Sequence, residues 1–543
     1  MHFIYTSVLI LFLAGCSAYD NTDRSPSIVG DINTSSSWYS DANNNVIDIK
    51  IAVPMPNKYE CGAYDNIVDI RPCTFEDIEH DESSYDSYKP VLSAVFSADN
   101  FQNVEDNIVF KLRGDYSRTL EQKSYSAKLF SKDNLFMSQR KFQFIKSQSD
   151  RSRVKNKLAY DLFREIPNIT SLKTQFFNLW IKSGDEEYKD YGLFTHVEAV
   201  RKEYLVNRGL NPDDNLYNVA NFMFNTYDEL AVNKEGVPLD EEAFGSILEI
   251  KNGEDHRKLN EMLEAVNSTQ NINEVIEKYF NRNNYLTWLA TNLVLGNKDT
   301  TYHNFYLYNP KYSNTFYFLP WDYDGAWAST VYLGKDEYGI SIWWESTLHR
   351  KFLSDSKNRE DLYKLADELR EKYITDEKIE SKIEGYKDSI RHFMSQFPDS
   401  LNNSESSWEK AINNFTVQTQ SNIDLYKSVI GHPMPFREFA TYENEKLNIS
   451  WDESIDLEGD AINYDLYISK DGNFSTIVYQ QKDINTTSLS LVNNKDINLT
   501  NGNYFLRVVS KEVDNPEHYQ IAFDQYYYSE IRYGVLMFNI EIE

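Results

Sequence analysis

The segment that most constrains the fold of this chain lies between residues 296 and 327, where two aromatic runs flank a turn. It reads GNKDTTYHNFYLYNPKYSNTFYFLPWDYDGAW. The runs FYLY and FYFL are typical of strands, and the Asn, Pro and Ser residues within 309–314 are typical of a turn. The pattern therefore predicts an antiparallel hairpin. Because a hairpin brings its two open ends together, Asn304 before the first strand and Asp322 after the second are expected to lie close together.

Oxygen-bearing side chains gather at this predicted open end. Asp299 precedes Asn304, and Asp322 and Asp324 follow the second strand. Carboxylates crowded into a small volume repel one another, and a divalent cation relieves that repulsion. Carboxylate and amide oxygens are the ligands that Mg²⁺ and Mn²⁺ prefer. The sequence therefore predicts a metal site at Asn304, Asp322 and Asp324, although Asp and Asn also serve simply as turn residues and helix caps.

The spacing of Asp299 and Asn304 adds a second indication. Four residues separate them, which is the D-x-x-x-x-N spacing of a protein-kinase catalytic loop. The same spacing arises often by chance. It gains weight here only because the predicted hairpin follows it directly.

The whole chain predicts several domains of mixed composition. It has 543 residues, a hydrophobic fraction of 41% and a formal net charge of −29, so two to four domains are expected. Strand patterns dominate residues 46–205, helical patterns dominate 206–432, and short strands return over 436–543, which predicts an α+β protein followed by an all-β unit. An acidic chain repels nucleic acid and anionic membrane surfaces and favours basic partners, although solubility alone also explains such a charge.

The amino terminus reads as an export signal. The apolar run within residues 1–15 is too short to span a bilayer and has the length of a signal-peptide core. The tetrapeptide Leu13-Ala14-Gly15-Cys16 resembles the lipobox of bacterial lipoproteins, which implies that an acylated Cys16 anchors the protein to a lipid bilayer. Residues 16–45 are expected to form a flexible tether. An ordinary cleaved signal peptide is the alternative, and Ser17 weakly favours the outer membrane or the cell surface as the final location.

Export makes a disulfide feasible between the two remaining cysteines. Cys61 and Cys73 are the only cysteines besides Cys16, and disulfides persist in oxidising compartments. We therefore expect them to pair, provided that their Cα atoms come within about 7 Å.

Three stretches in the expected order resemble the CotH kinase family, named for spore coat protein H. They are residues 112–128 (LRGDYS followed by KSYSAK), residues 191–198 (YGLFTHVE), and the pair GNKDTTYHN and PWDYD within 296–324. The resemblance covers about residues 46–430. It implies a two-lobed, atypical protein-kinase-like domain, and residues 436–543 resemble a fibronectin type III sandwich.

The resemblance also implies roles for individual residues. Asp299 would orient or deprotonate an acceptor hydroxyl, while Asn304 and Asp322 would hold Mg²⁺ or Mn²⁺. Lys128 would contact the phosphates of ATP. Lys123 competes for that role, but its offset of five places it on the opposite strand face.

Other contacts to ATP follow from the same resemblance. Arg113 and Ser117 would contact phosphates or form a strand-end turn, and Glu198 would lie near the nucleotide base. Asp161 or Glu165, on a helix expected over residues 153–166, would pair with the phosphate-binding lysine or be an exposed helix carboxylate. The chain lacks a Gly-x-Gly-x-x-Gly loop, and the family that it resembles also has an atypical loop at this position.

Three functions are compatible with these features. The favoured one is an atypical exported protein kinase that transfers the γ-phosphoryl group of ATP to Ser or Thr of a basic, Ser/Thr-rich protein acceptor. The alternative is a non-catalytic, pseudokinase-like surface scaffold or adhesion lipoprotein. A carbohydrate-associated module is a third reading, because the chain is rich in aromatic residues and carries an appended sandwich.

Overall fold

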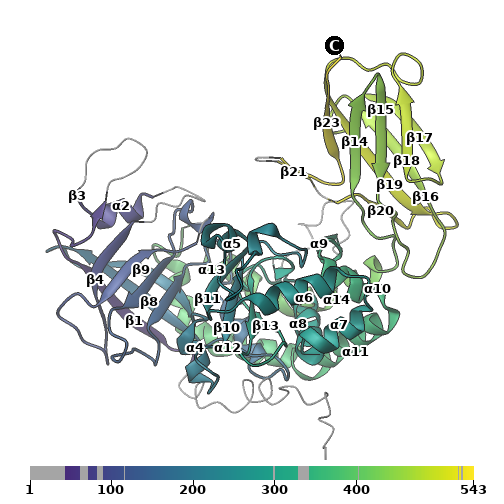
Figure 1. The fold of residues 1–543 in the computed structure, drawn as a ribbon. Coiled ribbons are helices and arrows are strands. Elements are labelled where there is room, and N and C mark those ends of the chain that lie inside the picture. The colour runs from purple at the N-terminus through teal and green to yellow at the C-terminus, as the bar shows by residue number, and fades with distance from the viewer. Residues whose placement is uncertain are drawn as a thin grey trace, which may run out of the picture.

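The protein is built around three separate hydrophobic cores. The computed structural model describes residues 43–61, 71–81, 90–114, 116–297, 300–327, 341–401, 403–523, 525–527 and 530–542. One core fills an amino-terminal barrel, a second and larger core lies within a mainly helical middle part, and a third lies between carboxy-terminal sheets. Figure 1 shows the three parts in chain order, coloured from purple to yellow.

The first part is a closed barrel whose strands follow the order β1-β4-β5-β6-β7-β9-β8. Its strands are β1 (Val46–Val53), β4 (Val91–Ala98), β5 (Ile108–Leu112), β6 (Tyr125–Leu129), β7 (Lys141–Ile145), β8 (Thr174–Ser183) and β9 (Lys189–Val197). All neighbouring strands are antiparallel except β1 and β8, whose parallel pairing closes the barrel. The strands expected from the alternating patterns before residue 130 are present as β1, β4, β5 and β6.

The two faces of β5, β6 and β7 have opposite character because successive side chains alternate. Inward residues such as Phe110, Tyr125 and Phe142 are almost fully buried in an aromatic core. Outward positions carry lysines and other polar side chains, Lys111 and Lys128 among them. This outer face later forms one wall of the candidate site.

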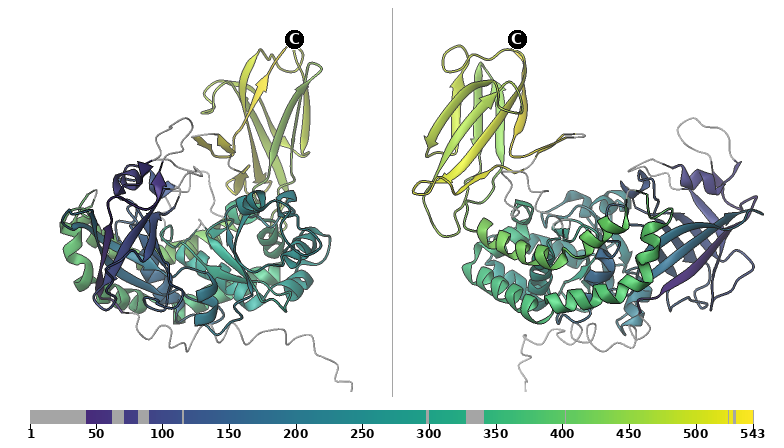
Figure 2. Two further views of the ribbon diagram at one scale, coloured as in Figure 1. Left: turned by 60° about the vertical axis from the view of Figure 1, so that its left-hand side comes forward. Right: turned by 180° about the vertical axis from the view of Figure 1, so that it is seen from behind.

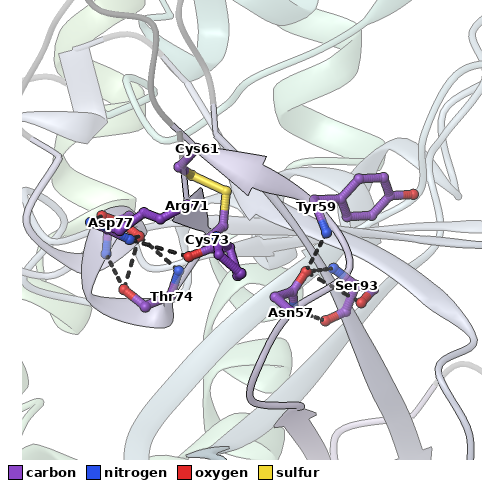
Figure 3. The surroundings of a disulfide bond; sticks show 9 residues. Asn57, Tyr59, Cys61, Arg71, Cys73, Thr74, Asp77 and Ser93 are labelled. Atoms are coloured by element: carbon purple, nitrogen blue, oxygen red, sulfur yellow. Dashed lines mark hydrogen bonds and ion pairs between the residues drawn. A yellow bond between two sulfur atoms is a disulfide. The ribbon is translucent and has the colours of Figure 1, made fainter. Parts of the chain in front are cut away.

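A disulfide fixes the chain beside the barrel. Cys61 and Cys73 are joined, with their Cα atoms 4.8 Å apart, as the sequence led us to expect. They end β2 (Glu60–Cys61) and follow β3 (Arg71–Pro72), and helix α2 (Phe75–Glu79) begins directly afterwards. Thr74 and Asp77 form a capping box at this helix, and Arg71 Nη1 donates to Asp77 Oδ2 at 2.8 Å (Figure 3).

The middle part contains a sheet of which the sequence pattern predicted only the hairpin strands. We expected residues 206–432 to be mainly helical, but β10 (Asn215–Val219) and β11 (Leu248–Asn252) join the hairpin strands β12 (Phe305–Asn309) and β13 (Tyr317–Pro320) in the order β11-β10-β12-β13. The described helices after α2 lie in this part and beside the barrel, where α3 packs against β8 and β9. They are α3 (Lys155–Phe163), α4 (Lys202–Asn207), α5 (Glu241–Ile247), α6 (Arg257–Asn267), α7 (Ile272–Tyr279), α8 (Arg282–Leu295), α9 (Ser341–Glu345), α10 (Thr347–Ser354), α11 (Ser356–Lys372), α12 (Asp376–Ile390), α13 (Glu405–Ile412) and α14 (Phe415–Val429).

The long helix α8 leads directly to the predicted hairpin. Its residues are buried on nearly every side, so it forms the centre of the middle part rather than its surface. Gly296 ends the helix in the left-handed conformation with φ 61°, as expected for a glycine at this position. Helix α8 therefore fixes where the segment that begins at Gly296 leaves the core.

The last part consists of two sheets around one core. The strands β14 (Glu438–Glu443), β15 (Lys446–Trp451) and β18 (Ser488–Val492) form one sheet, while β16 (Ile462–Ser469), β17 (Ile477–Ile484), β19 (Gly502–Glu512), β20 (Tyr519–Ile521) and β23 (Leu536–Ile540) form the other. A short pair, β21 (Gln525–Tyr527) and β22 (Glu530–Arg532), lies beside them. Trp451 and Leu466 pack in the shared core. This part stands apart from the barrel in each view (Figure 2).

Two predictions about the amino terminus are not tested here. The signal peptide, Cys16 and nearly all of the tether lie outside the described residues. Among the residues that the structure does describe, none of the helices has the length and apolar character needed to cross a membrane.

Candidate functional site

The hairpin predicted from the two aromatic runs is present. Strand β12 pairs antiparallel with β13, with Phe305 opposite Pro320 and Tyr308 opposite Tyr317. Asn304 therefore directly precedes the paired strands, and Trp321 and Asp322 directly follow them. The register brings both ends of the segment to the same edge of the sheet, as the sequence indicated.

Asn304 and Asp322 share an unusual backbone conformation. Asn304 has φ 55° and Asp322 has φ 59°. Residues other than glycine rarely adopt this left-handed region, which costs about 1–3 kcal/mol unless the surroundings enforce it. Both side chains are partly exposed. The hairpin thus presents an amide and a carboxylate from strained positions at one end.

The remaining acidic residues of the predicted site are less completely defined. Asp324 follows Asp322 in a turn and is also partly exposed. Asp299, the predicted catalytic residue, lies outside the described residues, so its position relative to Asn304 stays a prediction.

A group of cationic side chains lies on the outer face of the barrel. Lys128 on β6 stands directly opposite Lys141 on β7, and Lys111 on β5 stands opposite Ser126 on β6. Arg113 lies just beyond the end of β5, and its Nε donates to Gln143 Oε1 at 3.0 Å. These side chains share one face because residues paired across antiparallel strands point the same way. In a chain with a net charge of −29, such a local concentration of positive charge is notable.

Two further cations reach this face from other parts of the chain. Burial, followed by the nearby charges of Arg201, Lys251, Lys111 and Arg113, lowers the pKa of Lys141 to about 7. Arg201 precedes helix α4, and Lys251 lies on β11. The barrel, the start of α4 and the four-stranded sheet therefore contribute to one cationic cluster, which we define as Lys111, Arg113, Lys128, Lys141, Arg201 and Lys251.

The cationic cluster adjoins the end of the hairpin. The guanidinium of Arg113 lies over the ring of Trp321 at 5.7 Å, and Trp321 meets Tyr306 edge-on at 5.3 Å. Burial raises the pKa of Tyr306, and the charges that modify this pKa are those of Glu249, which is ion-paired with Lys251, and of Arg201, Arg113 and Asp322. Tyr306 is therefore within electrostatic range of both the cationic cluster and the acidic end of the hairpin.

Lys128 and Lys123 have different surroundings. Lys128 is exposed on the outer face of β6, and burial, followed by Arg140 and Arg201, lowers its pKa. Lys123 is buried instead, and its Nζ donates to the carbonyl oxygens of Asp81 and Arg118 at 3.0 and 2.5 Å. The expected role of Lys123 in ATP binding is thus replaced by a structural one.

Ser117 also has a local partner. Its Oγ donates to the Arg113 carbonyl oxygen at 2.9 Å. A Cβ at Gly114, whose φ is 82°, would lie 2.2 Å from this Oγ, so the turn requires glycine there. Of the two roles considered for Ser117, the structure favours the strand-end turn.

Glu198 is not a ligand-facing residue. Arg208 donates through both Nη atoms to its two carboxylate oxygens at 2.8 Å each, and Lys173 N donates to Oε2 at 3.0 Å. The side chains of Glu198 and Arg208 are 2% and 0% exposed. This buried, bidentate pair replaces the expected contact with a nucleotide base.

Helix α3 holds the two carboxylates that were considered as partners of the phosphate-binding lysine. Asp161 accepts hydrogen bonds from Lys157 at 3.0 Å and from the Tyr386 hydroxyl at 2.6 Å. Glu165, just beyond the helix, forms ion pairs with Lys378 and Lys382 at 2.7 Å each. Both acids therefore connect this region to helix α12 rather than to Lys128.

Another group of carboxylates lies in the carboxy-terminal part. One oxygen each from Asp456, Asp460 and Glu512 lies within 4.8 Å of the others. Asp456 Oδ1 accepts from the backbone nitrogens of its own turn, and His518 Nδ1 lies 3.0 Å from Glu512 Oε1. The sequence interpretation did not single out this group, which is separate from the hairpin.

The sequence interpretation missed four members of the cationic cluster: Lys111, Lys141, Arg201 and Lys251. Lys141 begins the strand KFQFI, in which alternation places Lys141 and Phe142 on different faces. This pattern could have identified Lys141 as an outward-facing cation. Arg201 and Lys251 carry no such local signal, because only the fold brings them to the barrel face.

The site thus belongs to a domain in which a cationic strand face adjoins an amide- and carboxylate-bearing hairpin end. The profile of the CotH kinase protein family matches residues 110–420, more than half of the chain and a range that contains both walls. The protein belongs to this family.

Comparisons with individual known proteins add to the match with the family profile. The inner spore coat protein H of Bacillus subtilis (strain 168) is 28% identical over 307 residues, which cover 54% of this chain and 79% of that protein. Among solved structures, the Helicobacter pylori proinflammatory kinase CtkA is 10% identical, covering 60% of this chain and 92% of that one, and the golgi casein kinase is 9% identical, covering 74% and 76%. Both have a TM-score of 0.21, which is too little overlap in three dimensions to assign a shared fold.

Proposed function

We propose that this protein is an atypical, exported protein kinase that transfers the γ-phosphoryl group of ATP to a Ser or Thr hydroxyl of a protein acceptor. Membership of the CotH kinase protein family supports the kinase class. The observation that carries the proposal is the meeting of the cationic cluster with the end of the hairpin. Phosphoryl transfer needs positive charge around phosphates and oxygen ligands for a metal within the same volume.

The residues present suit ATP and a divalent metal. Guanidinium and ammonium groups such as those of Arg113 and Lys141 are the usual partners of phosphate oxygens. The Asn304 amide and the Asp322 and Asp324 carboxylates are hard oxygen donors, which Mg²⁺ and Mn²⁺ prefer. A bound divalent ion would neutralise charge on the phosphates.

The proposed reaction assigns one task to each wall of the site. The cationic cluster binds and orients the phosphates of ATP, and Asp299 accepts the proton of the acceptor hydroxyl. The acceptor oxygen then bonds to the terminal phosphorus as the bond to the ADP oxygen breaks. Such a base typically contributes about 10²–10⁴-fold, and positioning with charge neutralisation supplies the rest.

The same proposal includes location and partners. The Cys61–Cys73 disulfide supports an oxidising compartment, in agreement with an exported lipoprotein anchored through Cys16 at the outer membrane or cell surface. The net charge of −29 suits a basic, Ser/Thr-rich acceptor. We further propose that the two sheets of residues 436–543 form a fibronectin type III-like sandwich beside a two-lobed kinase-like domain, because their strands share one core.

One observation favours the non-catalytic alternative. Lys123 and Glu198, two of the expected ATP contacts, are instead engaged in buried structural interactions. A pseudokinase-like scaffold would retain such a framework without transferring phosphate.

A transfer assay separates the two functions. The protein without residues 1–16 is incubated with labelled ATP, Mg²⁺ or Mn²⁺ and a basic Ser-rich peptide, alongside Asp299→Ala, Asp322→Ala and the exposed control Asp388→Ala. We expect label on the peptide with the unaltered protein and Asp388→Ala only. Equal transfer by all four proteins would end the kinase assignment, and nucleotide binding without transfer would favour the scaffold.

A further inference from the structure

We propose that Tyr160 and Asn156 of helix α3 are positioning residues that hold the Asp322 backbone in the conformation needed to present its carboxylate to a divalent metal. This inference rests on the proposed function, since it concerns the same site. Helix α3 would thus support metal binding although neither Tyr160 nor Asn156 is proposed to contact the metal.

The first step concerns the strain at Asp322. Its φ of 59° lies in the left-handed region, which is unfavourable for residues other than glycine. Such a conformation persists only when the surrounding structure enforces it. The contacts around this residue should therefore fix its peptide groups rather than only its side chain.

Three side chains from two different segments provide those contacts. The Asp322 N–H donates to the Tyr160 hydroxyl oxygen at 3.1 Å, and the next N–H, that of Tyr323, donates to Asn156 Oδ1 at 2.9 Å. On the other side, Asn297 Nδ2 donates to the Asp322 carbonyl oxygen at 3.4 Å. Both peptide groups that flank the Asp322 Cα are thus held from outside the hairpin.

The anchoring residues are themselves well fixed. Tyr160 is fully buried, and Asn156 is 3% exposed. The Tyr160 and Phe163 rings each meet the Tyr323 ring edge-on, at 5.7 and 4.9 Å. These contacts lock the spacing between α3 and the segment after β13, so a displacement of the helix would move Asp322 with it.

Asn156 is also costly for stability. Within the part of the chain that the structure describes, its buried Nδ2 has no hydrogen-bond partner, and leaving such a donor unsatisfied is destabilising. Leucine has nearly the same size and would avoid that cost. We therefore infer that the amide of Asn156 serves the hydrogen bond that its oxygen accepts from the Tyr323 N–H.

The acidic residues of this region do not provide the link. Asp161 is engaged by Lys157 and Tyr386, so α3 reaches the hairpin end through neutral hydrogen bonds instead of an ion pair. Asn156 and Tyr160 occupy successive turns of the helix, which places both on the face toward Asp322.

The test compares Tyr160→Phe and Asn156→Leu with Tyr204→Phe. The control hydroxyl is equally buried but donates to Thr170 Oγ1 at 3.2 Å, away from the hairpin. Mn²⁺ affinity is measured by electron paramagnetic resonance, and amide exchange by mass spectrometry on peptides that cover residues 320–325. Loss of a residue that orients a metal ligand typically weakens metal affinity about 10–100-fold.

We expect both α3 variants to bind Mn²⁺ at least about 10-fold more weakly and to exchange faster at residues 320–325, while Tyr204→Phe matches the unaltered protein. Melting temperatures identify any variant that fails to fold, and the other α3 variant then decides. If both α3 variants match Tyr204→Phe in affinity and exchange, the inference is wrong and the proposed function survives. If the unaltered protein binds no Mn²⁺, both are wrong.

Discussion

The end of the hairpin and the segment that follows β9 each carry an acidic residue within a family-like motif, but the two residues differ in burial and in pairing. Asp322 is partly exposed in a strained backbone conformation. Glu198 is buried, and both of its oxygens are occupied by Arg208. Both residues lie in stretches that resemble the family, and both were expected to contact the cofactor or its metal.

This difference separates a carboxylate that can bind a ligand from one that holds the fold together. A buried pair such as Glu198–Arg208 satisfies its charges internally, and removing one partner leaves the other uncompensated. A partly exposed carboxylate on a strained backbone gains little for stability from its position. Burial and pairing therefore distinguish the two roles where sequence motifs do not.

The largest expected effect is on catalysis at Asp322. Asp322→Ala should lower phosphoryl transfer at least about 10³-fold, because losing a metal ligand removes several kcal/mol of transition-state stabilisation. The melting temperature should fall modestly, because alanine tolerates the left-handed φ of 59° less well than aspartate. Initial rates with labelled ATP and thermal denaturation check the two halves of this prediction. A stable variant with at least a tenth of the original rate would contradict it.

The expected effect at Glu198 is on folding. Glu198→Gln leaves Arg208 buried without a charged partner and should lower the free energy of unfolding by about 3 kcal/mol. The rate per folded molecule should stay within about threefold of the original, since the carboxylate faces no ligand. Denaturant titration measures the stability, and active-site-normalised rates measure the catalysis. A variant that folds normally but loses ATP affinity would restore Glu198 to the nucleotide site.

Much of the fold around this comparison could be predicted from local sequence. The aromatic runs and the turn between them predict the hairpin, and Gly296 predicts the end of α8, because each of these signals acts over a few residues. Strands β10 and β11 were missed. They are short, a bulge interrupts their pairing between Leu216 and Tyr217, and their place beside β12 depends on long-range packing.

The residues of the candidate site likewise fall into those that local sequence predicts and those that only the fold brings together. Asn304 and Asp322 could be paired from the hairpin alone, since one turn brings them together. Arg201 and Lys251 join the site only because α4 and β11 fold against the barrel, which no local pattern encodes. Lys123 and Glu198 were misassigned because the motifs give residue types but neither burial nor partners.

A smaller effect distinguishes the two lysines that face each other across β6 and β7. Lys141→Met should raise the KM for ATP about 10-fold, while Lys128→Met should raise it less, because the charges that act on the pKa of Lys141 include four other cluster members and those that act on Lys128 include only Arg201. Each loss of about 1.4 kcal/mol of binding corresponds to a factor of ten. Initial rates over a range of ATP concentrations provide the measurement. A larger effect of Lys128→Met would support the assignment made from the sequence.

The smallest expected effect is a pH dependence that Lys141 imposes on the ligand-free protein. Burial and the neighbouring cations lower its folded-state pKa from 10.5 to about 7. Between these two values the unfolded chain binds a proton that the folded chain does not, so stability from this group rises with pH across that window. Below about pH 7 both states are protonated and the full penalty is present. Lys141→Met should reduce this slope without abolishing it, because burial also lowers the pKa of Lys251, whereas the exposed control Lys410→Met should keep it in full in melting temperatures measured from pH 6.5 to 9.5.

Bound ATP should raise the pKa of Lys141, which burial and the neighbouring cations lower in the ligand-free protein. Phosphate oxygens placed beside Lys141 favour its charged form, so binding should take up a proton and ATP affinity should fall as the pH rises above about 7. Calorimetric titrations in two buffers with different ionisation enthalpies measure that uptake directly, and Lys141→Met should abolish it. If proton uptake is unchanged in Lys141→Met, the phosphates bind elsewhere on the barrel face. If Lys141→Met abolishes the uptake, the phosphates lie beside Lys141, within the cationic cluster that adjoins the end of the hairpin.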